Sequence, residues 1–511
     1  MVAAVLKPAL AEQAPPPPAA GRVVPSRYQV GLIVVLGAIF LVALAPKLDT
    51  DLWWHLKDGA YIASHHAVPT SDYLSFTFAG HAWTDHEWLF DLFLYGCYRL
   101  AGLWGTIIAF AAIICATFGL VYARMAHAGV NRMLALFVLS AAFVASSATW
   151  GARPQMLTLF FLAVYALTLE RWLATRDRRF LAVFPAVMIL WANLHGGWVL
   201  GLAVLVLTLL GEWLNHANRH DGALSRGELR ALGVTIVLTL LATLLNPAGL
   251  REVLYPLVWI FPSAYSNVLT EWVSSDFHQP VTMVFEGMLL ALIAAFFIGR
   301  PRINWTHLIL ILAFTHLALS QARNVAVWAV LISPLLAIYL QRVRGERSAL
   351  ATSARPARTI RPRTERILNI TLLVLACSLY IVETLHFVNA KALGQNEAST
   401  FPAGAVHYLQ THRLPPRTFT SYAWGGYLLW KAYPRYRDFI DGRANTLFDT
   451  HLLNAYLTVS VVGPGWQGVL RHYRVQNVLV ESNAPLAQAL AVNSGWRLMY
   501  RDPVATLYTV R

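Results

Sequence analysis

The sequence predicts a polytopic α-helical membrane protein that carries a small α/β domain at its C-terminal end. Of its 511 residues 57% are hydrophobic and only 13% charged, whereas a soluble protein of this length has roughly 25% charged residues. Apolar stretches of about 17–25 residues, the length that crosses a bilayer as a helix, recur along most of the chain. From residue 396 onward the polarity becomes ordinary, which indicates a domain outside the lipid.

The apolar stretches predict about eleven membrane-spanning helices. We expect them at 29–46, 102–123, 132–149, 154–171, 179–194, 197–214, 231–246, 282–299, 303–320, 324–341 and 367–388. The expected domains are a disordered cytoplasmic tail at 1–28, which contains a proline run, a membrane domain at 29–390, and the α/β domain at 396–511. We interpret the first stretch as a retained helix rather than a signal peptide, because it is long for one and Pro46 follows the small residues that would be cleaved.

The distribution of arginines predicts how these helices are oriented. Arginines crowd every second loop, and the loop at 342–366 is the richest in them. Positive loops stay on the cytoplasmic side, so the N-terminus is expected to be cytoplasmic. This bias also explains the net charge of +14 without any nucleic-acid partner.

Nearly all unusual polar motifs fall in the other, external loops. They are D-T-D-L-W-W-H (49–55), T-D-H-E-W (84–88), G-A-R-P-Q (151–155), N-L-H-G-G-W (193–198), L-N-P-A-G-L (245–250), E-W-V-S-S-D-F (271–277) and Q-A-R-N (321–324). Polar residues near membrane depth are costly and usually functional. Their gathering on one face predicts a single site there.

Two regions outside the spans have patterns of their own. The first external loop is long, and Trp53, Trp54 and Tyr61 alternate with polar residues as in a helix that lies in the membrane interface. The run 88–100 either repeats this pattern or begins the next span. In the C-terminal domain, strands are expected at 475–481, 497–500 and 505–510, and helices at 450–461, 466–473 and 485–492.

Asp49 and Asp51 are candidate catalytic carboxylates. At this spacing they cannot share a helical face, but in an extended turn both can reach one pocket, where either could act as a general base for an acceptor hydroxyl. The structural alternative is a solvated loop in which a carboxylate pairs with Lys47 or Lys57.

A second pair of candidate catalytic carboxylates lies in the same loop, at Asp85 and Glu87, with His86 between them. A carboxylate pair beside a histidine could hold a divalent cation or orient a base. The alternative is helix capping, because Thr84 or Asp85 precedes the apolar run W-L-F-D-L.

Arg153 and Arg323 lie on the external side against the usual bias, and guanidinium groups suit a phosphate or pyrophosphate. A salt bridge to the loop carboxylates is the alternative. His195 precedes two glycines that let a ligand approach, although a tight helical hairpin would need the same residues. The remaining candidate substrate-binding residues are His55, His86 and Glu271, and for Glu271 packing or a turn is an alternative role.

Other classes of chemistry have no motif in this sequence. It contains no phosphate-binding loop, no dinucleotide fingerprint and no H-E-x-x-H motif. Its three cysteines form no metal or disulfide pattern. An activated lipid or an ion gradient would have to supply energy, and no cofactor is expected apart from a divalent cation, which stays open.

The chain resembles the GT-C glycosyltransferases, polytopic enzymes that take a sugar from a polyprenyl-phosphate carrier. The likeness rests on the first helix followed by a long external loop that opens with acidic residues. D-T-D-L-W-W-H-L-K-D-G, T-D-H-E-W-L, R-P-Q, N-L-H-G-G, L-N-P-A-G-L and F-I-D-G-R are similar to a family of bacterial membrane proteins described as glycosyltransferase-like.

The resemblance implies a bacterial inner-membrane enzyme with a periplasmic C-terminal domain. It would move a sugar by inverting displacement from a polyprenyl-phosphate donor to an extracytoplasmic acceptor, which is an envelope glycan, a lipid or a protein. Asp49 or Asp51 matches the acidic position after the first helix, and Asp85 and Glu87 match a second acidic motif of some families. The adjacent D-E pair of the mannosyltransferases is absent from the first loop's opening, which leaves the base and the sugar open.

Two other functions remain open at this stage. A transporter or lipid flippase would explain the many helices and the break at His195, but we find no inverted repeat and the motifs lie on one side. A non-catalytic protein of polysaccharide assembly would keep the fold with a degenerate site.

Overall fold

The protein was analysed as a computed structural model that describes residues 26–260, 272–350, 362–388 and 390–511. Every predicted span coincides with a helix. The helices are α1 (Arg27–Ala43), α3 (Trp88–His127), α4 (Arg132–Ser146), α5 (Pro154–Thr175), α6 (Arg179–Ala192), α7 (Trp198–Ala217), α8 (Arg226–Ala242), α10 (Pro280–Gly299), α11 (Trp305–Ser320), α12 (Val325–Leu350) and α13 (Pro362–Phe387).

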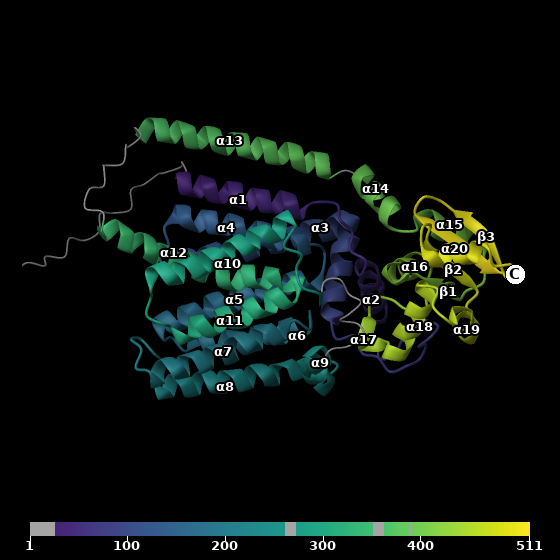
Figure 1. Cartoon of the computed structure of the whole chain (residues 1–511), viewed down its shortest axis with the longest axis horizontal. Coiled ribbons are helices and arrows are strands. Elements are labelled where there is room, and N and C mark those ends of the chain that lie inside the picture. The colour runs from purple at the N-terminus through teal and green to yellow at the C-terminus, as the bar shows by residue number, and fades with distance from the viewer. Residues whose placement is uncertain (1–25, 261–271, 351–361, 389) are drawn as a thin grey trace, which may run out of the picture.

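Length and composition make the chain a multi-pass membrane protein. Within the described ranges eight helical segments are long and apolar enough to cross a membrane, whereas α1, α6 and α11 are shorter apolar helices. The count of eleven spans therefore stays a prediction for these three helices. Successive helices run in opposite directions, and α13 lies along the outside of the bundle beside α1 (Figure 1).

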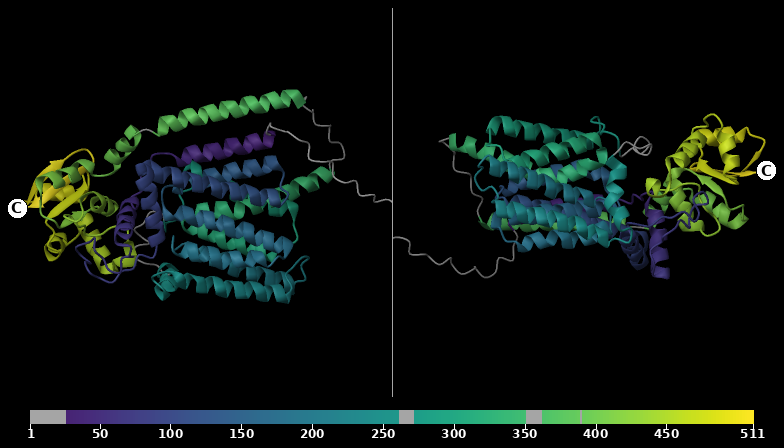
Figure 2. Two further views of the ribbon diagram at one scale, coloured as in Figure 1. Left: turned by 180° about the vertical axis from the view of Figure 1, so that it is seen from behind. Right: turned by 90° about the horizontal axis from the view of Figure 1, so that it is seen from below.

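The two ends of the bundle differ in character. The C-terminal domain projects beyond one end (Figure 2). At the other end α5, α7 and α10 stop at turns that contain arginines, and Arg176 and Arg300 close α5 and α10 in the left-handed conformation, with φ of 59° and 37°. We call these the site end and the basic end.

A buried arginine at the basic end compensates for a proline in α12. Pro334 has no N–H, so the carbonyl of Val330, four residues earlier, lacks its helical partner. Arg124 of α3 donates from Nη1 to that oxygen at 2.6 Å and forms an ion pair with Glu170 at 2.7 Å. The charge is thus paired and hydrogen-bonded, as burial requires.

Helix α3 contains a break that separates its first part from the membrane span. Ala101 and Gly102 leave the helical conformation, and Gly102 has a φ of 60° that favours glycine. The run 88–100 is therefore a helix with its own direction, joined to the membrane span at this break.

The predicted helix of the first loop is present as α2 (Leu52–His65), but the interpretation of its tryptophans as anchors in the membrane interface is wrong. Trp53 and Trp54 are 1% and 7% exposed. Trp53 packs edge-on against Phe401 and Tyr427, with ring centroids 5.3 and 4.9 Å apart. Helix α2 is held between α3 and α16 (Gly425–Ala432), so its apolar face binds the C-terminal domain rather than lipid.

The site end also carries short elements that connect the spans. They are η1 (Ser147–Thr149), η2 (Thr243–Leu245), α9 (Leu250–Ile260) and η5 (Ala322–Asn324).

The predicted strands and helices of the C-terminal domain are confirmed. The sheet has the order β1-β2-β4-β3, with β1 (Thr418–Thr420) parallel to β2 (Asn477–Glu481), and β4 (Ala505–Val510) antiparallel to β2 and β3 (Trp496–Arg501). The remaining elements are α14 (Ala390–Thr400), α15 (Ala403–His412), η6 (Tyr422–Trp424), α17 (Ala444–Leu447), α18 (Thr450–Ser460), α19 (Trp466–His472) and α20 (Pro485–Ala491). Strand β1 was not predicted, because three residues are too few to show the alternation of apolar and polar side chains that is typical of a strand.

Candidate active site

A cavity of about 510 Å³ lies at the site end, between the bundle and the C-terminal domain. Segments from far apart in the chain line it, namely the first loop, the start of α5, the α6–α7 turn, η5 and residues 422 and 442–446. The predicted site residues among the lining are Asp51, His55, Asp85, His86, Glu87, Arg153, His195 and Arg323. Asp49 is not among the lining residues, and Glu271 falls outside the described residues.

The two carboxylates of the D-T-D stretch have different surroundings. Asp49 accepts the backbone N–H of Asp51 at 2.9 Å and forms an ion pair with Arg153 Nε at 3.0 Å. The alternative of a salt bridge between Arg153 and a loop carboxylate is thus realised for Asp49. Asp51 lines the cavity directly, so it is the carboxylate that can meet a substrate.

Gly442 of the F-I-D-G-R stretch packs directly against Asp51. A Cβ atom at this position would lie 2.1 Å from Asp51 Oδ1 and 2.6 Å from Trp54 Nε1. Such distances are far inside van der Waals contact, so only glycine allows the C-terminal domain to close on this carboxylate.

We expect Gly442→Ala to lower the rate of the reaction at this site by up to about 10²-fold, because a displacement of about 1 Å in a reacting group costs that much. The fold should survive, since the clash is at the cavity surface. Steady-state kinetics beside a thermal unfolding curve would measure this, with Gly468→Ala as the control because nothing lies within 4 Å of that position. Equal rates for both variants would contradict the assigned contact.

Glu87 lies between two histidines, with its Oε1 3.7 Å from His86 Nε2 and 3.8 Å from His195 Nε2. The backbone N–H of Gly196 donates to the same oxygen at 3.2 Å. Burial raises the pKa of Glu87 to about 8. The group is therefore mostly protonated at neutral pH, where it can donate a hydrogen bond but is a poor base.

The hydrogen bonds of His195 define its tautomer. Its Nδ1 accepts from the backbone N–H of Gly197 at 3.1 Å, and Thr158 Oγ1 lies 2.6 Å from the same atom. Burial lowers the pKa of His195 well below its usual value, so the ring is neutral. A neutral ring whose Nδ1 accepts must carry its proton on Nε2, and this N–H faces the cavity beside Glu87.

The raised pKa of Glu87 predicts a pH dependence. As the pH rises through about 8 the carboxyl ionises and places a buried negative charge at the cavity wall. We expect binding of an anionic substrate to weaken over that pH range. Glu87→Gln should abolish this loss of binding, because the amide does not ionise, and should nearly preserve the activity at pH 7. Profiles of kcat/KM against pH for both proteins would measure it; an unchanged profile in the variant would contradict it.

His86 and Asp85 extend the wall. Burial lowers the pKa of His86 to about 4 and raises that of Asp85 to about 6. His86 is thus neutral, with its ring 4.4 Å from that of Tyr255, and its backbone carbonyl accepts Asn246 Nδ2 at 2.8 Å. The capping alternative is wrong, because the N-cap of α3 is Glu87 and its side chain makes no capping hydrogen bond; Asp85 Oδ1 accepts the N–H of Glu87 in the turn before the helix.

The cationic side of the cavity consists of arginines rather than histidines. Arg153 immediately precedes α5 and Arg323 lies in η5. The guanidinium of Arg323 stacks over the ring of Trp272 at 4.7 Å. Both arginines line the same space as the acidic residues Asp51, Asp85 and Glu87. Guanidinium groups in such a space suit a phosphate-bearing substrate.

His55 is more buried than a substrate ligand needs to be. It is 2% exposed, stacks on Trp54 and forms a 2.5 Å hydrogen bond through Nδ1 with Asp91 Oδ1. Its ring borders the cavity, but its polar contact joins α2 to α3.

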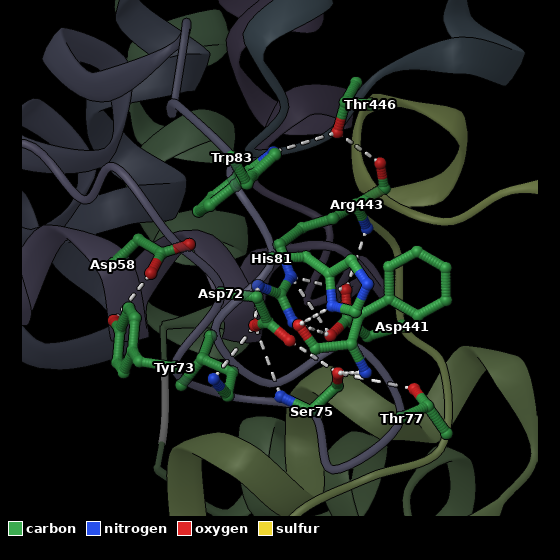
Figure 3. A network of polar contacts seen from close by, with 12 residues as sticks. Asp58, Asp72, Tyr73, Ser75, Thr77, His81, Trp83, Asp441, Arg443 and Thr446 are labelled. Carbon is green, nitrogen blue, oxygen red and sulfur yellow. Dashed lines mark hydrogen bonds and ion pairs between the residues drawn. The ribbon is translucent and has the colours of Figure 1, made fainter.

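Arg443, which is among the lining residues of the cavity, joins the first loop to the C-terminal domain (Figure 3). Its Nη1 donates to Asp72 Oδ1 at 2.7 Å, its Nη2 to Asp441 Oδ2 at 2.6 Å, and all three side chains are fully buried. The guanidinium also lies over Trp83, 5.1 Å from the ring centroid. Asp441, Arg443 and Asp72 thus form a buried ion-pair network that has a structural role.

Metal binding was left open by the sequence. Within the residues that the structure describes, no group of three or more His, Cys, Asp or Glu side chains is arranged to hold a metal ion. We therefore derive no step through a cation.

Asp91, Thr158 and Tyr422 were not predicted as parts of the site, and Gly442 was singled out only within the F-I-D-G-R stretch. Asp91 had a usable signal, since it is an acid within an apolar run. Thr158 and Tyr422 had none that spacing could reveal.

Comparison with known proteins shows the fold. No family model and no curated protein sequence matches this chain. Solved structures do, and they show that the chain has the fold of the GT-C glycosyltransferases that depend on polyprenyl phosphates.

Three matches illustrate the likeness. ArnT from Cupriavidus metallidurans bound to undecaprenyl phosphate is 15% identical, with a TM-score of 0.54 over 94% of this chain and 97% of that one. The archaeal oligosaccharyltransferase AglB from Archaeoglobus fulgidus, solved with an inhibitory peptide and a dolichol-phosphate, is 12% identical, with a TM-score of 0.54 over 94% and 74%. The mycobacterial arabinofuranosyltransferase AftD is 15% identical, with a TM-score of 0.51 over 94% and 41%.

Proposed function

We propose that this protein is a membrane glycosyltransferase that moves a sugar from a polyprenyl-phosphate donor to an acceptor on the external side of the membrane. The observation that carries this proposal is the cavity, in which Asp51 shares one space with Arg153 and Arg323 within a GT-C fold. A carboxylate and two guanidinium groups are the charges that a displacement at an anomeric carbon with a phosphate leaving group requires.

In the proposed reaction an acceptor hydroxyl oxygen attacks the anomeric carbon as the bond from that carbon to the phosphate oxygen breaks. Asp51 takes the hydroxyl proton, and the lipid phosphate leaves with the electron pair of the broken bond. Arg153 and Arg323 stabilise its charge, and the protonated Glu87 and the Nε2–H of His195 are further donors. Asp49 acts through its ion pair with Arg153 Nε, which orients that guanidinium.

The two ends of the bundle support one orientation of the protein. Arginine-containing turns favour the cytoplasmic side, so we infer that the basic end lies inside and that the site end, from which the C-terminal domain projects (Figure 1), lies outside. The proposal of a bacterial inner membrane rests on the resemblance alone. The lipid tail would lie between helices of the bundle, while the acceptor comes from the aqueous side.

The test is to incubate the purified full chain with defined polyprenyl-phosphate sugars and measure release of the lipid phosphate. We expect turnover with at least one donor, and its loss in Arg153→Ala with Arg300→Ala as a control at the basic end. Failure with all donors, together with ion-coupled uptake in vesicles, would instead support a transporter. Failure of both assays would favour a polysaccharide-assembly protein.

A further inference from the structure

A second space opens beside the cavity on the C-terminal domain. It is a groove of about 870 Å³, and most of its lining side chains are polar, among them Glu481, Asn483 and Arg501. Glu481 ends β2 and Arg501 ends β3. Both strands are antiparallel to β4, so the two residues lie at the same end of the sheet.

The groove and the cavity meet at Thr50, which lines both. Thr50 is exposed, and the side chain of the neighbouring Asp49 accepts the backbone N–H of Asp51. The helix η6 lies between the two spaces, with Tyr422 on the cavity and Trp424 on the groove. A molecule in the groove can therefore extend past Thr50 to Asp51.

We propose that this groove binds the acceptor, and that the acceptor is a carbohydrate chain. This inference rests on the proposed function and adds the substrate class to it. The groove offers carboxylates that accept from sugar hydroxyls, and an amide and a guanidinium that donate to them. The cavity supplies the base for the terminal hydroxyl of such a chain.

The same lining disfavours a lipid or an apolar peptide segment. The apolar side chains of the groove are Ala423, Trp424, Pro503 and Val504, and Trp424 is only 4% exposed, so apolar atoms make up about half of the groove surface rather than most of it. Small-molecule and chain ligands that are held by apolar contacts need a mostly apolar wall. A polyhydroxylated chain is the ligand that satisfies the groups present.

The experiment compares Arg501→Ala and Asn483→Ala with Arg497→Ala. Arg497 lies on the same strand and is also exposed, but it does not line the groove. Binding of the full chain to an immobilised panel of defined oligosaccharides is measured, and so is donor turnover with oligosaccharide, peptide or lipid acceptors. We expect the two groove variants to weaken oligosaccharide binding and raise the acceptor KM about tenfold, with unchanged acceptor-independent release of lipid phosphate.

The outcomes separate this inference from the proposed function. Donor turnover with transfer only to peptide or lipid would overturn the carbohydrate assignment and leave the transferase standing. If oligosaccharide binding depended on Arg501 but no donor was turned over, the groove would be supported as a carbohydrate-binding site. The proposed glycosyltransferase activity would then be contradicted. If Arg497→Ala and Arg501→Ala weakened oligosaccharide binding equally, the assignment of the groove as the acceptor site would be overturned.

Discussion

We expect Asp51→Asn to lower the rate of the proposed sugar transfer by about 10²–10⁴-fold, the usual contribution of a positioned general base. An asparagine has the size of the aspartate and keeps its place beside Gly442, but it cannot accept the proton of the attacking hydroxyl. The KM for the donor should change little, because Asp51 acts on the acceptor. The measurement is a single-turnover rate at saturating donor.

Two further variants make this result specific. Asp49→Asn should mainly raise the donor KM, because it loosens Arg153 from its ion pair. Asp221 lies at an exposed turn at the basic end. Its replacement, Asp221→Asn, should leave the transfer rate and the donor KM unchanged. A folded Asp51→Asn protein with the full transfer rate would exclude Asp51 as the base.

Arg443→Met destabilises the protein by about 3–5 kcal/mol, the cost of removing one partner from a buried ion pair. The change leaves Asp72 and Asp441 buried without their shared cation. Since Arg443 joins the first loop to the C-terminal domain (Figure 3), we also expect faster proteolysis near their junction. Thermal unfolding and limited proteolysis measure the two effects, with the exposed Arg471→Met as control.

The electrostatic cause can be tested through pH and a second change. Burial acts to raise the pKa of Asp72, but Arg443 and the hydrogen bonds from Ser75 and Leu74 outweigh it and lower the pKa. A carboxyl group whose pKa is lower in the folded than in the unfolded protein stabilises the fold at pH values above the ordinary pKa of Asp. This stabilisation is lost as the pH falls through the pKa of the folded state. The deficit of Arg443→Met should therefore shrink toward acidic pH, and Asp72→Asn with Asp441→Asn should recover part of it. A pH-independent deficit would point to lost packing instead.

Patterns local in the chain were predictable. Apolar runs located the helices, because a span must satisfy its backbone polar groups within one segment. Alternation located β2, β3 and β4, and the external motifs located most of the cavity wall, including Asp51, Glu87 and Arg153. Recognition of the GT-C class followed from the same order of features and agrees with the solved structures.

What the sequence by itself determined is therefore the membrane architecture, the α/β domain and the set of polar loops that form the site, since each depends on composition and period within a short stretch. Only the tertiary structure decided the roles within that set. Asp49 is held by Arg153, whereas Asp51 faces the cavity against Gly442, and Trp53 packs on Tyr427 instead of lipid. These contacts join the first loop to a domain that begins more than 300 residues later. No spacing rule can reveal them, because they arise only when the two surfaces close on each other.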